Sequence, residues 1–278
     1  MGKVKIKKKS TFIDMTAMSD VTVLLLTFFM LTSTFLQKEP TIVYTPSSVS
    51  EEKVPVSNLV TILISSADKG KVPEGKDATE AEGKIFISFS GGMDSTQVAP
   101  VIRGKMLDEA LKVYNAQAKD SKKIALTDAQ KKVFQETNML GTSFEYLPEL
   151  LSKSLTEIDK EQGDMYNPNT GIPIDGNKDK NGHLNDFQIW CRAIYTVSKE
   201  LHDNMATDMG LTVDEAKTLG DLYNAITKDG TGIAIKADKD TPFTTVETVF
   251  DNLQTMSLNK FSLMTALTSE EEAAPAKH

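Results

Sequence analysis

One carboxylate lies at the edge of the longest uncharged run in this sequence. Asp20 is followed by sixteen residues without a charge, Val21–Leu36, and the segment counted from Phe12 has 25 residues. At about 1.5 Å per residue such a segment forms a helix of roughly 37 Å, and about 20 residues suffice to cross a bilayer. Because a charge within hydrocarbon costs several kcal/mol, Asp20 is a candidate functional residue.

Three threonines share a helical face with Asp20. At about 100° per residue, Thr27 lies about 20° from Asp20 around the helix axis, and Thr16 and Thr34 lie about 40° from it. Such a polar stripe fits an ion path that faces protein or water, with Asp20 as the carrier. It fits equally a helix that starts at Val21 with Asp20 as its N-cap, and threonines that bond to their own backbone.

The flanking charges predict the orientation of this segment. Five lysines lie among the first nine residues and no such cluster follows the apolar run. The positive-inside rule places the N-terminus in the cytoplasm and residues 37–278 outside it. A cleaved signal peptide is the alternative. Two aspartates lie between the lysines and the apolar run, however, and no small-residue cleavage site follows, so we expect an uncleaved, single-pass anchor.

The remainder of the chain has the composition of a globular protein. Its 278 residues are 40% hydrophobic and 25% charged, which suits one or two domains. A single cysteine, Cys191, excludes an intramolecular disulfide framework. The first twenty residues carry a net charge of +3, which leaves −11 for the rest of a chain whose total is −8. An acidic region of this kind argues against nucleic acid as a partner.

Residues 37–278 predict an α+β fold. Proline and polar residues in 37–57 indicate a linker. Residues 60–65 and 85–89 are β-type runs, whereas 94–230 is mainly helical by pattern. Within that helical region we expect helices at 101–114 and 190–205, and helix starts after Thr127 and Thr212.

The segment around Asp20 resembles the membrane helix of the ExbD/TolR family of bacterial energy-transducing proteins. It reads Ile-Asp-Met-Thr-Ala-Met-Ser-Asp-Val-Thr-Val-Leu-Leu-Leu-Thr-Phe-Phe-Met-Leu from residue 13 to residue 31, and the family shows Asp-Val, then Leu-rich sequence, then Phe-Met. The resemblance places Asp20 on the family's ion-carrying aspartate. Ala17 departs from the usual proline, and Asp14 falls where the family varies, often with asparagine, so Asp14 receives no ion-carrying role.

The C-terminal part resembles the same family. Residues 232–254 are similar to the family's strand, charged turn and helix, and residues 260–267 are similar to its last strand. The resemblance implies an α+β domain after one membrane helix, enlarged by a helical insertion. The expected parts are a basic cytoplasmic tail (1–11), a transmembrane helix (12–36), a periplasmic linker (37–57), the family's domain (58–90 and 211–268), the insertion (91–210) and a disordered tail (269–278).

The resemblance also implies the function. It indicates a non-enzymatic subunit of an ion-driven motor in the bacterial inner membrane, without a cofactor, that uses the proton motive force to energise TonB-dependent outer-membrane transport. The implied partners are a second copy of the chain, a pentameric ExbB-like pore and a TonB-like transducer. A TolR-like role, with peptidoglycan as a partner, is one alternative. A signal-anchored periplasmic binding module with no ion path is another.

One motif within the expected insertion resembles a calcium-binding loop. Asn177, Asp179 and Asn181 occupy its first, third and fifth positions, Gly182 its sixth and Gln188 its twelfth. Asparagine and glutamine replace two carboxylates at the first and twelfth positions, which weakens Ca²⁺ binding. Such clusters are also ordinary turn sequence. His183, His202 and Cys191 lack a zinc-site spacing, so we expect no metal.

Overall fold

The computed structural model describes residues 15–32, 43–48, 59–66, 74–75, 77, 82–90, 98–174, 182–202, 222–264 and 266–267. The chain divides into two units, Met1–Lys38 and Glu39–His278, and each is described by itself.

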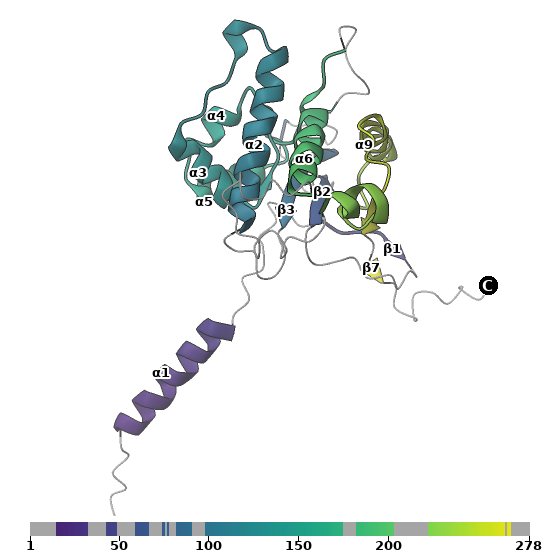
Figure 1. The fold of residues 1–278 in the computed structure, drawn as a ribbon. Helices are drawn as coiled ribbons and strands as arrows, with labels where there is room; N and C mark the ends of the chain where they lie inside the picture. The colour runs from purple at the N-terminus through teal and green to yellow at the C-terminus, as the bar shows by residue number, and fades with distance from the viewer. Residues whose placement is uncertain are drawn as a thin grey trace, which may run out of the picture. The chain divides into compact units, whose positions relative to one another are not determined.

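The first unit contains one helix, α1, which spans Met15–Thr32 (Figure 1). Its 18 residues correspond to about 27 Å at 1.5 Å per residue. The helix begins five residues before Asp20, so the interpretation of Asp20 as the N-cap of a helix that starts at Val21 is wrong. Residues 12–14 and 33–36 of the expected membrane segment lie outside the described residues. No helix in the described ranges satisfies both the length and the apolarity that a membrane crossing requires.

The second unit is built on a mixed five-stranded sheet with strand order β4-β3-β2-β5-β6. The predicted strand pair is confirmed, since β2 (Leu59–Ser65) and β3 (Lys84–Ser90) are antiparallel neighbours. β5 (Ile233–Ala237) runs parallel to β2, and β6 (Ser262–Met264) runs parallel to β5. β4 (Met139–Leu140) pairs antiparallel with β3. Two further short strands, β1 (Ser47–Ser48) and β7 (Ala266–Leu267), form a separate parallel pair.

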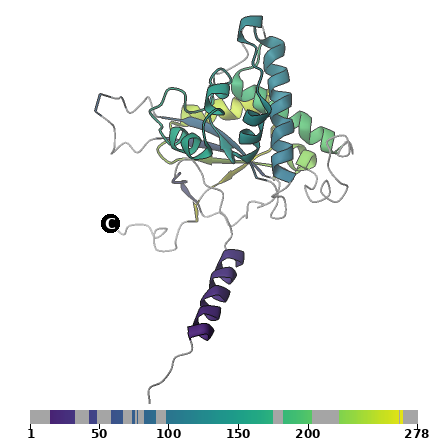
Figure 2. The ribbon, with the colours of Figure 1, turned by 90° about the vertical axis from the view of Figure 1, so that its left-hand side faces the viewer.

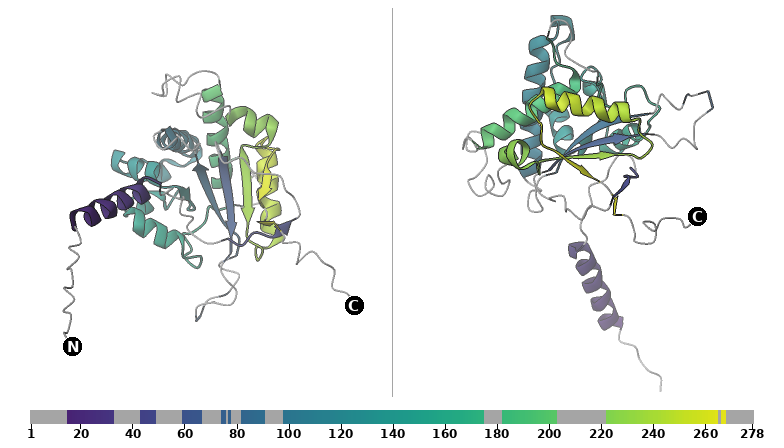
Figure 3. Two further views of the ribbon diagram at one scale, coloured as in Figure 1. Left: turned by 90° about the horizontal axis from the view of Figure 1, so that it is seen from below. Right: turned by 90° about the vertical axis from the view of Figure 1, so that its right-hand side faces the viewer.

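Helices cover one face of this sheet. They are α2 (Val98–Gln117), α3 (Asp128–Glu136), α4 (Leu147–Leu150), α5 (Leu155–Gln162), α6 (Asp186–His202), α8 (Leu222–Asn224) and α9 (Phe243–Thr255), with a 3₁₀ turn at Asp120–Lys122 and a π-helical turn at Ala225–Asp229. α2 packs against α3 and α6, and α6 packs against α9. Figure 2 shows α2 along one side of the unit, and the right-hand view of Figure 3 shows α9 lying over the strands.

Local sequence determines where several of these helices begin. Thr127 and Gln130 form a capping box at the start of α3, which confirms the predicted helix start. α6 begins at Asp186, four residues before the expected start at Trp190, because Asn185 and Gln188 cap it reciprocally. The helix start expected after Thr212 lies outside the described residues.

The helical region and the sheet share one hydrophobic core. Val60, Ile62 and Ile64 of β2 alternate with side chains of the opposite face, as the two-residue period of a strand dictates. They belong to the same buried cluster as Leu107 of α2 and Ile189 of α6. Residues 91–210 therefore contribute the main cover of the sheet and one of its strands, β4, in addition to helices.

Candidate functional site

Asp20 lies in the second turn of α1 and its side chain is exposed. The residues that follow it are apolar, and the side chains of Val21, Leu24 and Phe28 are also exposed. A helix that exposes large apolar side chains around a single carboxylate presents a surface that another molecule covers. Because Asp20 is exposed on this surface, a partner or a bilayer that covers the helix would form its surroundings.

Thr27 lies two turns after Asp20 on the same stripe, as the sequence predicts. Its hydroxyl donates a hydrogen bond to the carbonyl oxygen of Leu24 at 2.9 Å, and Thr22 donates in the same way to Ser19 at 2.8 Å. This backbone bonding is the alternative role that the sequence leaves open for these threonines. The bond to the backbone uses only the hydroxyl proton of Thr27. Its oxygen can still accept a hydrogen bond from water or a partner.

The structure brings together only part of the predicted stripe. The backbone of Thr16 belongs to α1, four residues before Asp20, and Thr34 lies outside the described residues. Of the predicted stripe, the structure therefore places the side chains of Asp20 and Thr27, and the positions of the other two threonines follow only from helical periodicity.

The calcium-loop residues are mostly outside the described ranges. Asn177, Asp179 and Asn181 belong to this group. Gln188 is described: it is fully buried in the first turn of α6, and its Oε1 accepts a hydrogen bond from the backbone N–H of Asn185 at 3.3 Å. Across the described part of the chain, no three His, Cys, Asp or Glu side chains lie close enough to hold a metal ion.

The strongest polar cluster among the described residues lies between α4 and α5. Lys153 donates from its ammonium group to Glu161 at 2.6 Å and to the hydroxyl of Tyr146 at 2.7 Å, and that hydroxyl donates to Glu161 at 2.6 Å. Hydrogen bonds to Glu161 and Tyr146 raise the pKa of Lys153, so this amine is held in its charged form. A lysine held in its charged form cannot act as a base. The role of the cluster is therefore structural: it joins α4 to α5.

Two residues with unusual surroundings were not singled out by sequence. Arg103 is buried in α2, and Trp190 of α6 has a buried indole nitrogen. The available signal was that Arg103 falls on the buried stripe formed by Ala99, Met106 and Ala110, at helical spacing.

Comparison with protein-family models gives a match to the family described as "Biopolymer transport protein ExbD/TolR" over residues 7–179. This range is more than half of the chain. The chain belongs to the ExbD/TolR family. Comparisons with curated proteins and with solved structures found no match.

Membership of the ExbD/TolR family has direct consequences. Members are non-enzymatic motor subunits that associate with ExbB- or TolQ-type proteins and are typical of the bacterial inner membrane. The matched range contains α1 with Asp20, the strand pair β2–β3 and helices α2 to α5. Residues 232–254 and 260–267 also resemble the family by sequence. They lie outside the range that the family model matches.

Proposed function

We propose that this chain is the ExbD-like subunit of an ion-driven motor, with Asp20 as the residue that binds and releases the ion. The observation that carries the proposal is the position of Asp20: a carboxylate inside an otherwise uncharged helix, within the range that the family model matches. In the proposed arrangement residues 12–36 span the bacterial inner membrane once, the N-terminus is cytoplasmic and the larger unit is periplasmic.

The proposed mechanism follows from the cost of a charge in a dry environment. Two copies of α1 lie within a pore of ExbB-like subunits. When Asp20 faces water it is ionised, and binding of an ion neutralises it so that it can pass a dry part of the interface. One elementary charge moved through 100 mV supplies about 2.3 kcal/mol. Relative rotation of the two components converts this energy into work, which the periplasmic unit transmits to a TonB-like transducer.

Thr16, Thr27 and Thr34 line the path on the same face as Asp20. The hydroxyl proton of Thr27 is satisfied by the helix backbone, so its oxygen is available to water or the partner. These positions therefore modulate the passage of the ion, whereas Asp20 is required for it.

The test is a substitution that removes the charge and little else. Asp20→Asn preserves side-chain size, and Asp14→Asn is the matched control in the same segment. In cells with the variant as the only copy, we expect uptake of a TonB-type cargo under iron limitation to fail for Asp20→Asn and to persist for Asp14→Asn. Protein level and assembly with the pore subunit are measured in parallel. Normal uptake with Asp20→Asn contradicts the proposal.

The same cells separate the ExbD-like function from its alternatives. Normal uptake combined with division or outer-membrane defects in the Asp20→Asn strain would indicate a TolR-like role linked to peptidoglycan. No defect of any kind would indicate a membrane-anchored periplasmic binding module in which the carboxylate has no motor function.

A further inference from the structure

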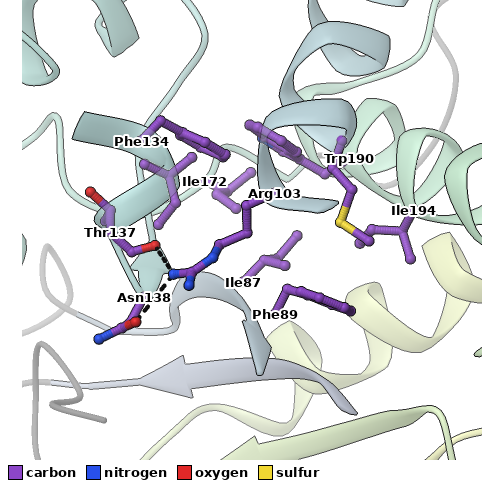
Figure 4. A pocket seen from close by; sticks show the side chains of 11 residues that line it. Ile87, Phe89, Arg103, Phe134, Thr137, Asn138, Ile172, Trp190 and Ile194 are labelled. Carbon is purple, nitrogen blue, oxygen red and sulfur yellow. Dashed lines mark hydrogen bonds between the residues drawn. The ribbon is translucent and has the colours of Figure 1, made fainter. Parts of the chain in front are cut away.

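A buried arginine lies at the edge of an apolar cavity in the second unit. Arg103 comes from α2 and only 9% of it is exposed. Its Nη1 donates to the carbonyl oxygen of Thr137 at 2.7 Å and to Oδ1 of Asn138 at 3.1 Å (Figure 4). Its Nε donates to the carbonyl oxygen of Ala99 at 3.4 Å. These contacts fix the guanidinium at the C-terminus of α3.

The charge of Arg103 lacks an anionic partner within the described residues. None of the ion pairs there includes Arg103, and its Nη2 makes no hydrogen bond there. The C-terminus of α3 offers about half a negative charge, so part of the positive charge is uncompensated. Burial lowers the pKa of Arg103, which is the expected effect when a cation is desolvated without a carboxylate beside it.

A second hydrogen-bond donor without a partner lines the same cavity. Trp190 is 5% exposed, and its buried Nε1 has no partner in the described part of the structure. The indole is stacked on Phe134 and Phe144, with ring centroids 5.7 and 5.1 Å away. Because stacking on two rings fixes the indole, its N–H cannot turn to find another acceptor. An unpaired buried donor of this kind destabilises the fold unless a ligand or water accepts its hydrogen bond.

The other walls of the cavity are apolar. They come from the sheet and from the helical region, and include Ile87, Phe89, Met106, Ile172 and Ile194 (Figure 4). The cavity leaves about 40 Å³ for the centres of water molecules. At roughly 10–15 Å³ for each water this space holds about three waters, or an apolar group of similar size.

We propose that this cavity binds a small monocarboxylate of two or three carbon atoms, which is the size that a space for about three waters admits. The carboxylate would accept hydrogen bonds from Nη2 of Arg103 and from Nε1 of Trp190, and the apolar body would occupy the space between the isoleucines and Phe89. The proposal does not depend on the ion path proposed for α1.

Charge and desolvation favour a carboxylate over other groups. A planar guanidinium matches the geometry of a carboxylate. A phosphate dianion would bring a second negative charge into apolar walls with only one cation present, which is costly. A neutral alcohol could accept from the two donors but would leave the charge of Arg103 uncompensated.

The first test needs no substitution. Trp190 is the only tryptophan in the chain, so its fluorescence reports on this cavity directly. The full chain is titrated with acetate, with ethanol, which has the same body without the charge, and with isovalerate, which has the charge but is too large for the space. We expect a saturable change for acetate at a concentration at least about tenfold lower than for either control, since ethanol cannot pair with the charge of Arg103 and isovalerate cannot enter.

Two variants and one control then locate the site. Arg103→Met removes the charge while retaining length, and Ile194→Phe fills the cavity without touching the arginine. Each is expected to abolish the preference for acetate in calorimetric titration, whereas Arg192→Met, on the exposed side of α6, is expected to keep it. Circular dichroism verifies that each variant is folded.

The fluorescence titration of the unmodified chain tests the proposal even if a variant does not fold. An equal response to acetate and to ethanol would show an apolar cavity without anion recognition and would overturn the proposal. So would the absence of any response, or a preference that survives in a folded Arg103→Met variant.

Discussion

The role of a side chain in this protein depends on where it lies in the fold. Asp20 and Glu161 are both carboxylates, yet one lies exposed on an apolar helix and the other is held between Lys153 and Tyr146. The role of Asp20 depends on where its helix begins. Because α1 starts at Met15, Asp20 cannot be its N-cap. The hydrogen bonds from Lys153 and Tyr146 determine the role of Glu161, which is structural.

A prediction at this scale concerns acid stability. Burial alone would raise the pKa of Glu161, but hydrogen bonds from Lys153 and Tyr146 outweigh burial and lower it below its ordinary value of 4.5. A carboxyl group whose folded pKa is lowered stabilises the fold above its unfolded pKa, and this contribution is lost as the pH falls through the folded value. We therefore expect Glu161→Gln to lower the unfolding temperature at pH 7 and to flatten the loss of stability below about pH 4.5.

The control is Glu145→Gln, in an exposed pair with Lys122 whose side chains are 64% and 60% exposed. Exposed pairs contribute little, so this variant should follow the unmodified protein. Parallel acid profiles for Glu161→Gln and the unmodified protein would contradict the structural role of the cluster.

At the scale of elements, hydrogen bonds at helix starts determine several boundaries. α3 begins where Thr127 and Gln130 bond to each other's backbone, and α5 begins at a second capping box formed by Ser154 and Glu157. Each box satisfies backbone N–H groups that a helix leaves unpaired in its first turn. The boundaries of these short helices are therefore local properties, whereas their packing is not.

We expect Thr127→Ala to destabilise the protein by about 1 kcal/mol, because it removes the acceptor for the N–H of Gln130. Thr248→Ala, the same substitution inside α9, should have little effect because alanine is the better helix former. Chemical denaturation measures both. Equal effects of the two substitutions would show that the capping box contributes nothing.

At the scale of the whole molecule, the larger unit has one core that joins the helical region to the sheet. Leu107 of α2 is completely buried in the same cluster as Ile62 and Ile235 of the sheet. Burial shared across these elements predicts that they unfold together rather than as a sheet with a separate helical attachment.

Leu107→Ala tests this cooperativity. Removal of a buried leucine side chain costs about 2–5 kcal/mol. We expect the fluorescence of Trp190 and the far-ultraviolet circular dichroism to shift together to lower denaturant concentration. Leu155→Ala, at a position 38% exposed, should shift both only slightly. Separate transitions for the two signals would indicate that the helical region folds independently.

Much of this architecture follows from sequence. The β-type runs predict β2 and β3, the helix-start pattern at Thr127 predicts α3, and the resemblance around Asp20 predicts the family. Strand β4 has only two residues and exists because it pairs with β3, so no local pattern indicates it. The burial of Arg103 likewise depends on how α2 packs against distant elements. Gln188, which suggests part of a calcium loop by sequence, instead caps α6 together with Asn185.

The central claim is that the charge of Asp20 carries the ion. The most direct measurement is ion flux into vesicles that contain the complex of this chain with its pore subunit, under an imposed gradient of H⁺ or Na⁺. We predict that Asp20→Asn assembles but abolishes flux, whereas Asp14→Asn leaves flux unchanged. Undiminished flux through an assembled Asp20→Asn complex would contradict the account.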